Sequence, residues 1–337
     1  MIGENIKRYR VLKGLSLRNF GELVNMSQTA IMKYEKDILK PDGEKLIMFA
    51  NVLGCSVLDL LKDNSNRRKL DLKYRKREYL SDKKISLLNE IISTRINNYL
   101  DVLELNNISN IKLKKYKVSS LEDASKAAIN FRVNNKLNEI LPLINLCNII
   151  ENLGISIIMI DNKDDKFKGF DGLSEVVDGY PFICIASNIN YYRQRFTLAH
   201  ELGHLILDID GSLDEEKVCN EFASSLLLPK KAMNLEFGIK RVYISDREFE
   251  IARDEYHVSI KAIIYSLERN GIITSSNAKS SYINFNKNLL EKENELSKRY
   301  KETPKKYEQL TNRLYNQELI TESRFNELSL DFYNEKI

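Results

Sequence analysis

The chain has 337 residues, and 43% of them are hydrophobic, so we expect two or three domains with real cores. Lys and Arg number 52 against 48 Asp and Glu, which gives a net charge of only +4; any basic patch for nucleic acid must therefore be local. The four Cys form no C-x-x-C pair and indicate free thiols of a reducing compartment. No apolar run approaches the roughly 20 residues needed to span a bilayer, so the expected location is the cytoplasm, with no membrane contact.

Residues 1–62 predict a bundle of five short helices. Ser16 and Ser27 each stand where a helix begins, and a tight turn over 25–27 separates the two helices that they cap. Helix, three-residue turn and helix form the geometry that places a second helix in the major groove of DNA. A small helical bundle used only for protein contact is the alternative.

The second of these helices supplies the candidate DNA contacts. Gln28 and Thr29 lie in its first turn, where side chains can reach base edges, and Lys33 follows for a phosphate. Ser27, the residue that caps the helix, completes this group.

This region resembles the Xre/Cro-type helix-turn-helix family. The residues that carry the resemblance are Ser16, Phe20-Gly21, Met26-Ser27-Gln28, Ile31, Tyr34-Glu35, Pro41, Leu46, Ala50, Leu53-Gly54-Cys55-Ser56 and Leu60. The resemblance implies a lambda-repressor-like fold and double-stranded operator DNA as a partner. Leu17 stands where the family often has a Gln that contacts phosphate, and Arg18 is the candidate replacement.

Residues 63–119 predict a basic linker followed by a long helix. Between Arg67 and Lys84, Lys and Arg outnumber Asp and Glu. A solvated linker is the favoured interpretation, and an extension of the DNA-binding surface is the alternative. Apolar residues at helical spacing from Lys83 to Leu105 predict one amphipathic helix, which is either a spacer or the surface of a homodimer.

The next region alternates short helices and strands. Helices are expected over 121–131 and 143–153, and strands over 155–160, 168–174 and 180–186. Pro181 disfavours a central position in a sheet and suits a strand start or an edge. A free edge beside a metal site could pair an extended peptide, and a plain structural edge is the alternative.

The segment 196–207 carries the strongest chemical signal, His-Glu-x-x-His in a helical composition. Residues four apart share a helix face, so His200 and His204 can hold one metal ion, expected to be Zn²⁺ with Mn²⁺ as an alternative. Zinc lowers the pKa of water that it coordinates from about 15.7 to about 7, and Glu201 is the candidate general base that takes the proton. A chance match on a surface helix is the alternative; the apolar neighbours instead predict a largely buried helix, where imidazoles need partners.

A third ligand is expected from a helix over 214–228. Its acids are Asp214, Glu215, Glu216 and Glu221. We choose Glu216 because small or polar residues share its face, among them Asn220, which could hydrogen-bond a ligand imidazole. Glu215 and Glu221 are expected to be solvated, and Asp208 and Asp210 to be ordinary helix-end acids.

Residues 120–230 resemble the ImmA/IrrE family of metallopeptidases. The matching motifs are Phe170-Asp171-Gly172-Leu173-Ser174, Arg193-Gln194-Arg195-Phe196-Thr197-Leu198-Ala199-His200-Glu201-Leu202-Gly203-His204, Glu216-x-x-Cys219-Asn220-x-Phe222-Ala223 and Leu226-Leu227-Leu228-Pro229. The resemblance implies a zincin-like α+β core with His200, His204 and Glu216 as ligands and Glu201 as general base. It also implies a protein substrate, a repressor-like regulator. A repressor whose zincin-like domain only senses a ligand or partner is the alternative function.

The rest of the chain is expected to be helical. Residues 236–275 predict a helix-turn-helix-like subdomain, with His257 in its turn exposed to solvent rather than stabilising an oxyanion. Residues 276–337 predict one or two peripheral helices and a frayed end. The predicted fold class is α+β and mostly helical, with domains over 1–62, 63–119, 120–235, 236–275 and 276–337.

Overall fold

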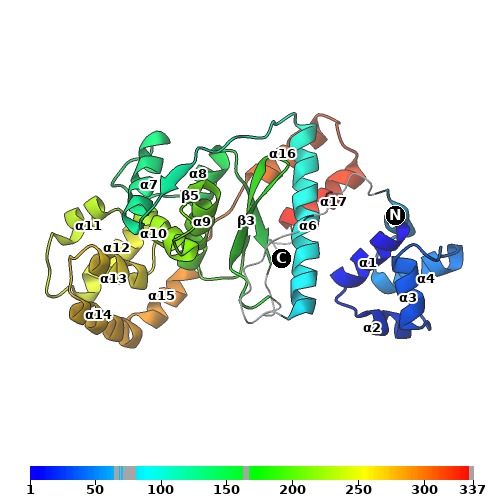
Figure 1. Cartoon of the computed structure of the whole chain (residues 1–337), viewed down its shortest axis with the longest axis horizontal. Helices are drawn as coiled ribbons and strands as arrows, with labels where there is room; N and C mark the ends of the chain where they lie inside the picture. The colour runs from blue at the N-terminus through cyan, green and yellow to red at the C-terminus, as the bar shows by residue number, and fades with distance from the viewer. Residues whose placement is uncertain (64–67, 69, 71–80, 162–166, 334–337) are drawn as a thin grey trace. The chain divides into compact units, whose positions relative to one another are not determined.

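The structure, a computed structural model, describes residues 1–63, 68, 70, 81–161 and 167–333 (Figure 1). The chain divides into two compact units, one containing Met1–Asp101 and the other most of the chain from Val102 onward. The predicted domain boundaries stay predictions. Most of the predicted basic linker lies outside the described residues, including Arg67, Lys69, Lys73, Arg75, Lys76 and Arg77. No helix in the described part of the chain is long and apolar enough to cross a membrane.

The first unit begins with the predicted five-helix bundle. Its helices are α1 (Ile2–Leu12), α2 (Leu17–Leu23), α3 (Gln28–Glu35), α4 (Gly43–Leu53) and α5 (Val57–Leu61). Ser16 accepts a hydrogen bond from Asn19 N at 3.0 Å and Ser27 one from Ala30 N at 3.2 Å, as expected of helix caps. Phe20 and Phe49 lie fully buried at the centre, with ring centroids 5.4 Å apart.

Helix α6 (Asp82–Leu105) confirms the predicted long amphipathic helix. Five of its buried residues recur at intervals of three and four, so they form one stripe along the helix. This stripe consists of Leu88, Ile92, Ile96, Tyr99 and Leu103.

Two small sheets organise the second unit. Strand β1 (Tyr116–Val118) pairs in parallel with β5 (Leu207–Ile209). In the other sheet, β4 (Tyr180–Ala186) is central, parallel to β2 (Ser156–Ile160) and antiparallel to β3 (Gly172–Val177). Neither β1 nor β5 was predicted, because three residues are too few for an alternating pattern.

A strand start and an edge strand were the two placements expected for Pro181. It lies at the start of β4, and β4 is the central strand of its sheet. Pro181 pairs only with Val176 of β3, and the pairing of β4 with β2 begins at Phe182. The missing N–H of Pro181 therefore removes no hydrogen bond between β4 and β2, so the proline is tolerated in a central strand.

Helices surround these sheets and share one core. They are α7 (Leu121–Asn134), α8 (Leu146–Asn152), α9 (Tyr191–Ile206), α10 (Glu215–Leu227), α11 (Lys230–Phe237), α12 (Asp246–Tyr256), α13 (Ile260–Arg269) and α14 (Ser275–Asn288). The core runs from Tyr116 to Leu289, so residues 236–275 pack into the same core as residues 120–235. Helix α9 contacts β3 and β4 on one side and α10 on the other (Figure 1).

The turn between α12 and α13 resembles the turn between α2 and α3. His257 in their turn has φ 53°, close to the 54° of Asn25 in the first turn. Ser259 accepts a hydrogen bond from Ala262 N at 3.2 Å, as Ser27 does from Ala30 N. The two turns are therefore alike, and the helix-turn-helix-like subdomain over 236–275 stays a prediction.

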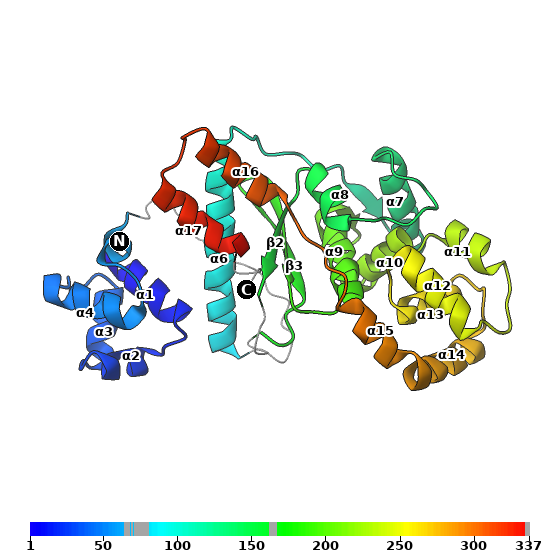
Figure 2. The same ribbon diagram turned by 180° about the vertical axis from the view of Figure 1, so that it is seen from behind.

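The prediction of a peripheral tail with one or two helices is wrong. Beyond α14 the chain forms α15 (Leu290–Ser297), α16 (Lys306–Asn316) and α17 (Glu322–Tyr333), and it passes α9 and α8 between α15 and α16 (Figure 2). Glu302 accepts a hydrogen bond from Cys147 N of α8 at 3.0 Å. Conversely, Glu151 of α8 accepts bonds from Lys305 N at 3.0 Å and Lys306 N at 2.9 Å, where α16 begins. Acids that look solvated in the sequence thus satisfy free N–H groups at two helix starts.

Candidate metal centre

Helix α9 carries the His-Glu-x-x-His motif on a well-packed scaffold. Leu198, Ala199 and Leu202 are fully buried, which fixes the rotation of the helix about its axis. The opposite face turns toward α10, and there the side chains of His200 and His204 are only 12% and 11% exposed. A chance motif on an exposed surface helix would not hold both imidazoles in this way.

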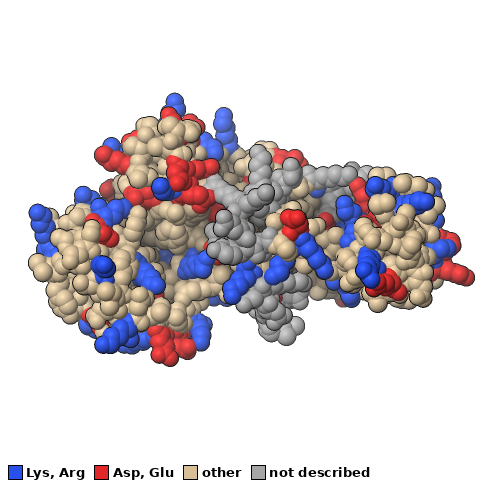
Figure 3. All heavy atoms as spheres, turned by 60° about the horizontal axis from the view of Figure 1, so that its bottom comes forward, with Lys and Arg blue, Asp and Glu red and all other residues tan. Residues whose placement is uncertain are grey.

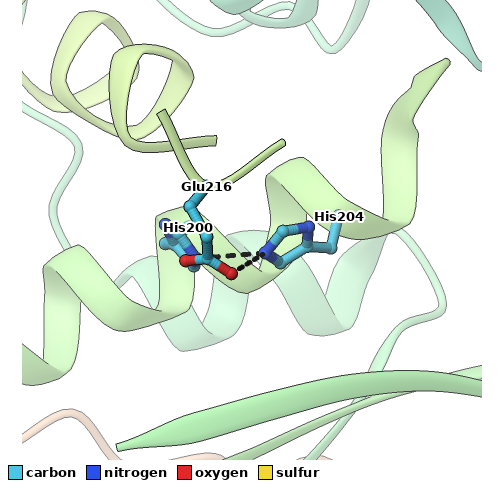
Figure 4. Close-up of side chains that lie close together, drawn as sticks. All are labelled: His200, His204 and Glu216. Atoms are coloured by element: carbon cyan, nitrogen blue, oxygen red, sulfur yellow. Dashed lines mark hydrogen bonds and ion pairs between the residues drawn. The ribbon is translucent and has the colours of Figure 1, made fainter. Parts of the chain in front are cut away.

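Three candidate ligands converge between α9 and α10 (Figure 4). The Nε2 atoms of His200 and His204 lie 3.0 Å apart. Glu216 reaches in from α10, with Oε2 3.3 Å from His200 Nε2 and Oε1 3.9 Å from His204 Nε2. One ligand atom from each residue lies within 4.8 Å of the other two.

These distances fit a small tetrahedral cation. With metal–ligand bonds of about 2.05 Å, the edge of a tetrahedron is about 3.3 Å, close to the spacings between these atoms. At a separation of 3.0 Å the two ring nitrogens can share a proton or bind one cation between them. A His, His and carboxylate set with one further position is the donor combination of catalytic zinc.

Residues of α10 contact both imidazoles at Nδ1, the ring nitrogen on the side away from Glu216. Asn220 Oδ1 lies 2.9 Å from His200 Nδ1, as the prediction for Asn220 has it, and Glu215 Oε1 lies 2.9 Å from His204 Nδ1. Both oxygens accept, so the Nδ1 of each imidazole donates, and Nε2, the nitrogen nearer Glu216, is the atom that would bind a metal. Cys219 Sγ also lies 3.1 Å from His204 Nδ1.

The candidate general base, Glu201 of α9, is hydrogen-bonded by a residue of strand β3. Glu201 is 7% exposed, and Ser174 Oγ donates a hydrogen bond of 2.9 Å to Glu201 Oε2. Gly172 allows this close approach, because a Cβ there would lie 2.7 Å from Thr197 Cγ2 and 3.3 Å from Glu201 Cγ. Ser174 belongs to the motif Phe170–Ser174, but its contact with Glu201 was not foreseen.

One of the expectations about nearby acids is wrong. Glu215 is exposed as expected, with 53% of its side chain accessible, but it also contacts His204. Glu221, expected to be solvated, is 7% exposed and pairs with Arg269 Nη1 at 2.7 Å. Asp210 accepts a hydrogen bond from Ser212 N at 2.9 Å, a turn interaction, and Asp208 lies in β5; neither is among the converging ligands in the described chain.

The expectation that His257 is exposed is also wrong. Its Nδ1 lies 3.2 Å from the hydroxyl of Tyr191, and its ring meets those of Tyr191 and Tyr300 edge-on. Burial, and next the positive charge of Arg195, lower its pKa. The sequence of the turn gave no indication that Tyr191 and Tyr300 contact His257.

The candidate DNA contacts of α3 all lie on its outer surface. Gln28, Thr29 and Lys33 are exposed, and none of them packs into the bundle. Arg18 pairs with Glu22 on α2 at 2.9 Å, with its side chain 79% exposed. Charges of both signs are scattered over the described part of the face in Figure 3.

The fold and the site define a protein of two parts, a helix-turn-helix transcriptional regulator domain fused to a domain of metallopeptidase type. Residues 6–60 belong to the helix-turn-helix family. Residues 150–268 belong to the peptidase family described as the IrrE N-terminal-like domain, and this match extends through α12 and into α13.

One curated relative matches part of the chain, the uncharacterised HTH-type transcriptional regulator YqaE of Bacillus subtilis (strain 168). It is 34% identical over 68 residues, which cover 20% of this chain and 59% of the relative. A Mycobacterium tuberculosis transcriptional regulator matches with 14% identity, 51% coverage of each chain and a TM-score of 0.30. Bacillus thuringiensis PlcR in complex with the peptide PapR7 and DNA matches with 14% identity, coverage of 98% and 92%, and a TM-score of 0.18. These TM-scores are too low for either structure to indicate the fold or the function of this chain.

Proposed function

We propose that this protein is a cytoplasmic regulator that binds operator DNA and hydrolyses a peptide bond in a partner regulator, itself repressor-like. The observation that carries the proposal is the convergence of His200, His204 and Glu216, with the motif glutamate Glu201 held beside them. Zn²⁺ is the expected ion, because the donor set and its spacing suit it, and Mn²⁺ is the alternative.

The residues of the chain divide the chemistry between them. Bound zinc would supply Lewis acidity, polarising the scissile carbonyl and making water in the site more acidic. Glu201 takes a proton from the attacking water and passes it to the leaving amine. Ser174 keeps the carboxylate of Glu201 oriented by donating a hydrogen bond to its Oε2.

An extended polypeptide is the substrate class that the surroundings favour. Strand β3 is at the edge of its sheet and contacts α9, and among the described residues no strand pairs with its outer side. A peptide can add to such an edge by main-chain hydrogen bonds, which places it alongside the motif helix. Because the DNA-binding domain is in the same chain, a regulator bound to the same promoter would be close to the site.

On DNA, we assign Gln28 and Thr29 to base edges and Lys33 to a phosphate. Arg18 supplies a second phosphate contact once it leaves Glu22, and Ser27 orients the start of α3. A homodimer would place two α3 helices one DNA turn apart, so a palindromic operator is expected if the protein is dimeric.

The test is the Glu201→Gln variant, with Glu122→Gln as a matched control because Glu122 is on α7 with a side chain 78% exposed. Partners captured by Glu201→Gln protein are identified, and their termini are compared in cells with wild-type or variant protein. The expected result is a new terminus in one captured partner with wild-type and Glu122→Gln protein only. Cleavage that persists with Glu201→Gln would overturn the assignment of the base. Operator binding without cleavage of any partner would favour a sensor domain instead.

A further inference from the structure

A cavity of about 280 Å³ is lined in part by Phe196, the residue whose ring neighbours that of His200. Its walls come from α9, α10, α15, and α13 with the segment that leads into it. Apolar atoms contribute most of the lining, from Tyr192, Phe196, Leu227, Val258 and Ala262 among others, and the polar residues are Asn190, Arg193, Ser259 and Glu293. All of them belong to the second unit.

The cavity and the metal centre are on one stripe of α9. Phe196 is four residues before His200, so the two side chains share a helix face, and their ring centroids are 6.4 Å apart. Four residues advance a helix by about 6 Å, and an extended peptide advances about 3.3 Å per residue, so the offset corresponds to about two residues of a bound peptide.

Helix α10 extends the same path. Glu215 contacts His204 and Asn220 contacts His200, so α10 runs antiparallel to α9. Continuing in that direction brings Leu227, near the end of α10, opposite the beginning of α9, where it lines the cavity. The cavity is therefore lined by the same two helices that carry the candidate ligands, α9 and α10, near the beginning of α9 and the end of α10.

The size and lining of the cavity indicate which kind of chemical group fits it. Pockets for drug-sized ligands measure about 300–1,000 Å³, so this volume suits one large side chain rather than a cofactor. The acid in its wall does not select a cation: Glu293 is 4% exposed and accepts a hydrogen bond of 2.7 Å from Ile260 N, at the start of α13. Burial raises the pKa of Glu293, which further favours an apolar occupant.

We propose that this cavity is a specificity subsite that takes a large apolar side chain of the polypeptide substrate, one to three residues from the scissile bond. The proposal rests on the proposed peptidase function and adds the substrate class to it. A substrate with an aromatic or long aliphatic residue at that position is cleaved in preference to one with alanine or lysine there.

The probes are hydroxamate-capped dipeptide amides, which bind a metal ion through the hydroxamate and need no turnover. Four are compared: alanine at both positions, phenylalanine at the first, phenylalanine at the second, and lysine at the position that phenylalanine favours. Their affinities are measured by calorimetry with zinc-loaded Glu201→Gln protein. One of the two phenylalanine probes is expected to bind at least about tenfold more tightly than the alanine probe, and the lysine probe no more tightly than alanine.

Ala262→Trp fills the cavity, and Tyr265→Trp is the matched control on the same helix, where Tyr265 is 50% exposed. The natural chain contains no Trp, so the fluorescence of the introduced indole reports directly whether it is buried. The preference for phenylalanine should be lost in the first variant and kept in the second. If Ala262→Trp does not fold, the affinities of the four probes for the Glu201→Gln protein alone still test the proposal.

Equal affinity for all probes, tightest binding of the lysine probe, or a preference that survives Ala262→Trp would each overturn the subsite. Zinc content, measured first by elemental analysis after dialysis, separates the two proposals. Protein that binds no zinc contradicts the proposed function, whereas zinc-loaded protein without a side-chain preference contradicts the subsite alone.

Discussion

Arg195 of α9 and Glu302, which precedes α16, form an ion pair in which the two side chains are 0% and 4% exposed. Arg195 Nε also donates to His257 O at 2.9 Å, and Glu302 also accepts from Cys147 N at 3.0 Å. The pair thus links the motif helix to α8, to the turn before α13 and to the segment near residue 300.

Glu302→Ala should destabilise the protein by about 3–5 kcal/mol, because it leaves the guanidinium of Arg195 buried without its partner. Chemical denaturation followed by circular dichroism measures the change. Glu295→Ala is the control, since Glu295 pairs with Lys298 at the surface, with side chains 65% and 69% exposed. A loss no larger than that of the control would mean that the pair does not support the fold.

Glu215→Ala and Asn220→Ala should each lower zinc affinity by about 10- to 100-fold, because each removes the acceptor that fixes the Nδ1 proton of one histidine. Competition with a coloured chelator measures the affinity. Lys217→Ala, on the same helix with a side chain 74% exposed, should leave it unchanged. Unchanged affinity in the first two variants would show that these contacts do not hold the imidazoles.

Lys33→Ala should weaken binding to all DNA sequences and reduce the salt slope by about 1, as expected for one lost phosphate contact. Gln28→Ala should instead cost about 1–3 kcal/mol on the best site and relax its sequence preference. Binding curves at several salt concentrations, with a site selected from random DNA, separate the two effects. A purely sequence-specific loss for Lys33→Ala would contradict its assignment to a phosphate.

His257 should make the stability of the fold depend on pH. Because its pKa is lowered in the folded protein, the unfolded chain binds its proton more readily, so stability is full above about pH 6.5 and declines as pH falls below it. His257→Asn removes this titration and suits the positive φ of 53°. Melting temperatures from pH 8 to pH 5, with chelator present, should fall less in the variant than in the wild type. Parallel curves would contradict the lowered pKa.

The helices and the two histidines of the motif could be predicted from the sequence because their signals are local. Ser16 and Ser27 cap helices within a few residues, and Gly54 ends α4 in the left-handed conformation with φ 71°. The spacing of His200 and His204 likewise fixes a shared helix face without any knowledge of the rest of the fold.

The remaining features depend on contacts between distant segments. Glu302 is 107 residues from Arg195, and the sequence around it reads as a solvated, Lys- and Glu-rich helix. Glu215 and Glu216 are neighbours, so only the register of α10 against α9 decides which faces the Nε2 atoms and which faces Nδ1. That register is a property of the packed pair of helices.

The carboxylate that neutralises Arg195 is encoded far downstream of the motif helix. During translation the helix-turn-helix bundle can fold as soon as it leaves the ribosome, since its buried residues lie within the first sixty. The guanidinium of Arg195 gains its carboxylate partner only once residue 302 has been made. Vectorial synthesis therefore lets the helix-turn-helix bundle form first, and the scaffold of the candidate metal centre is completed last.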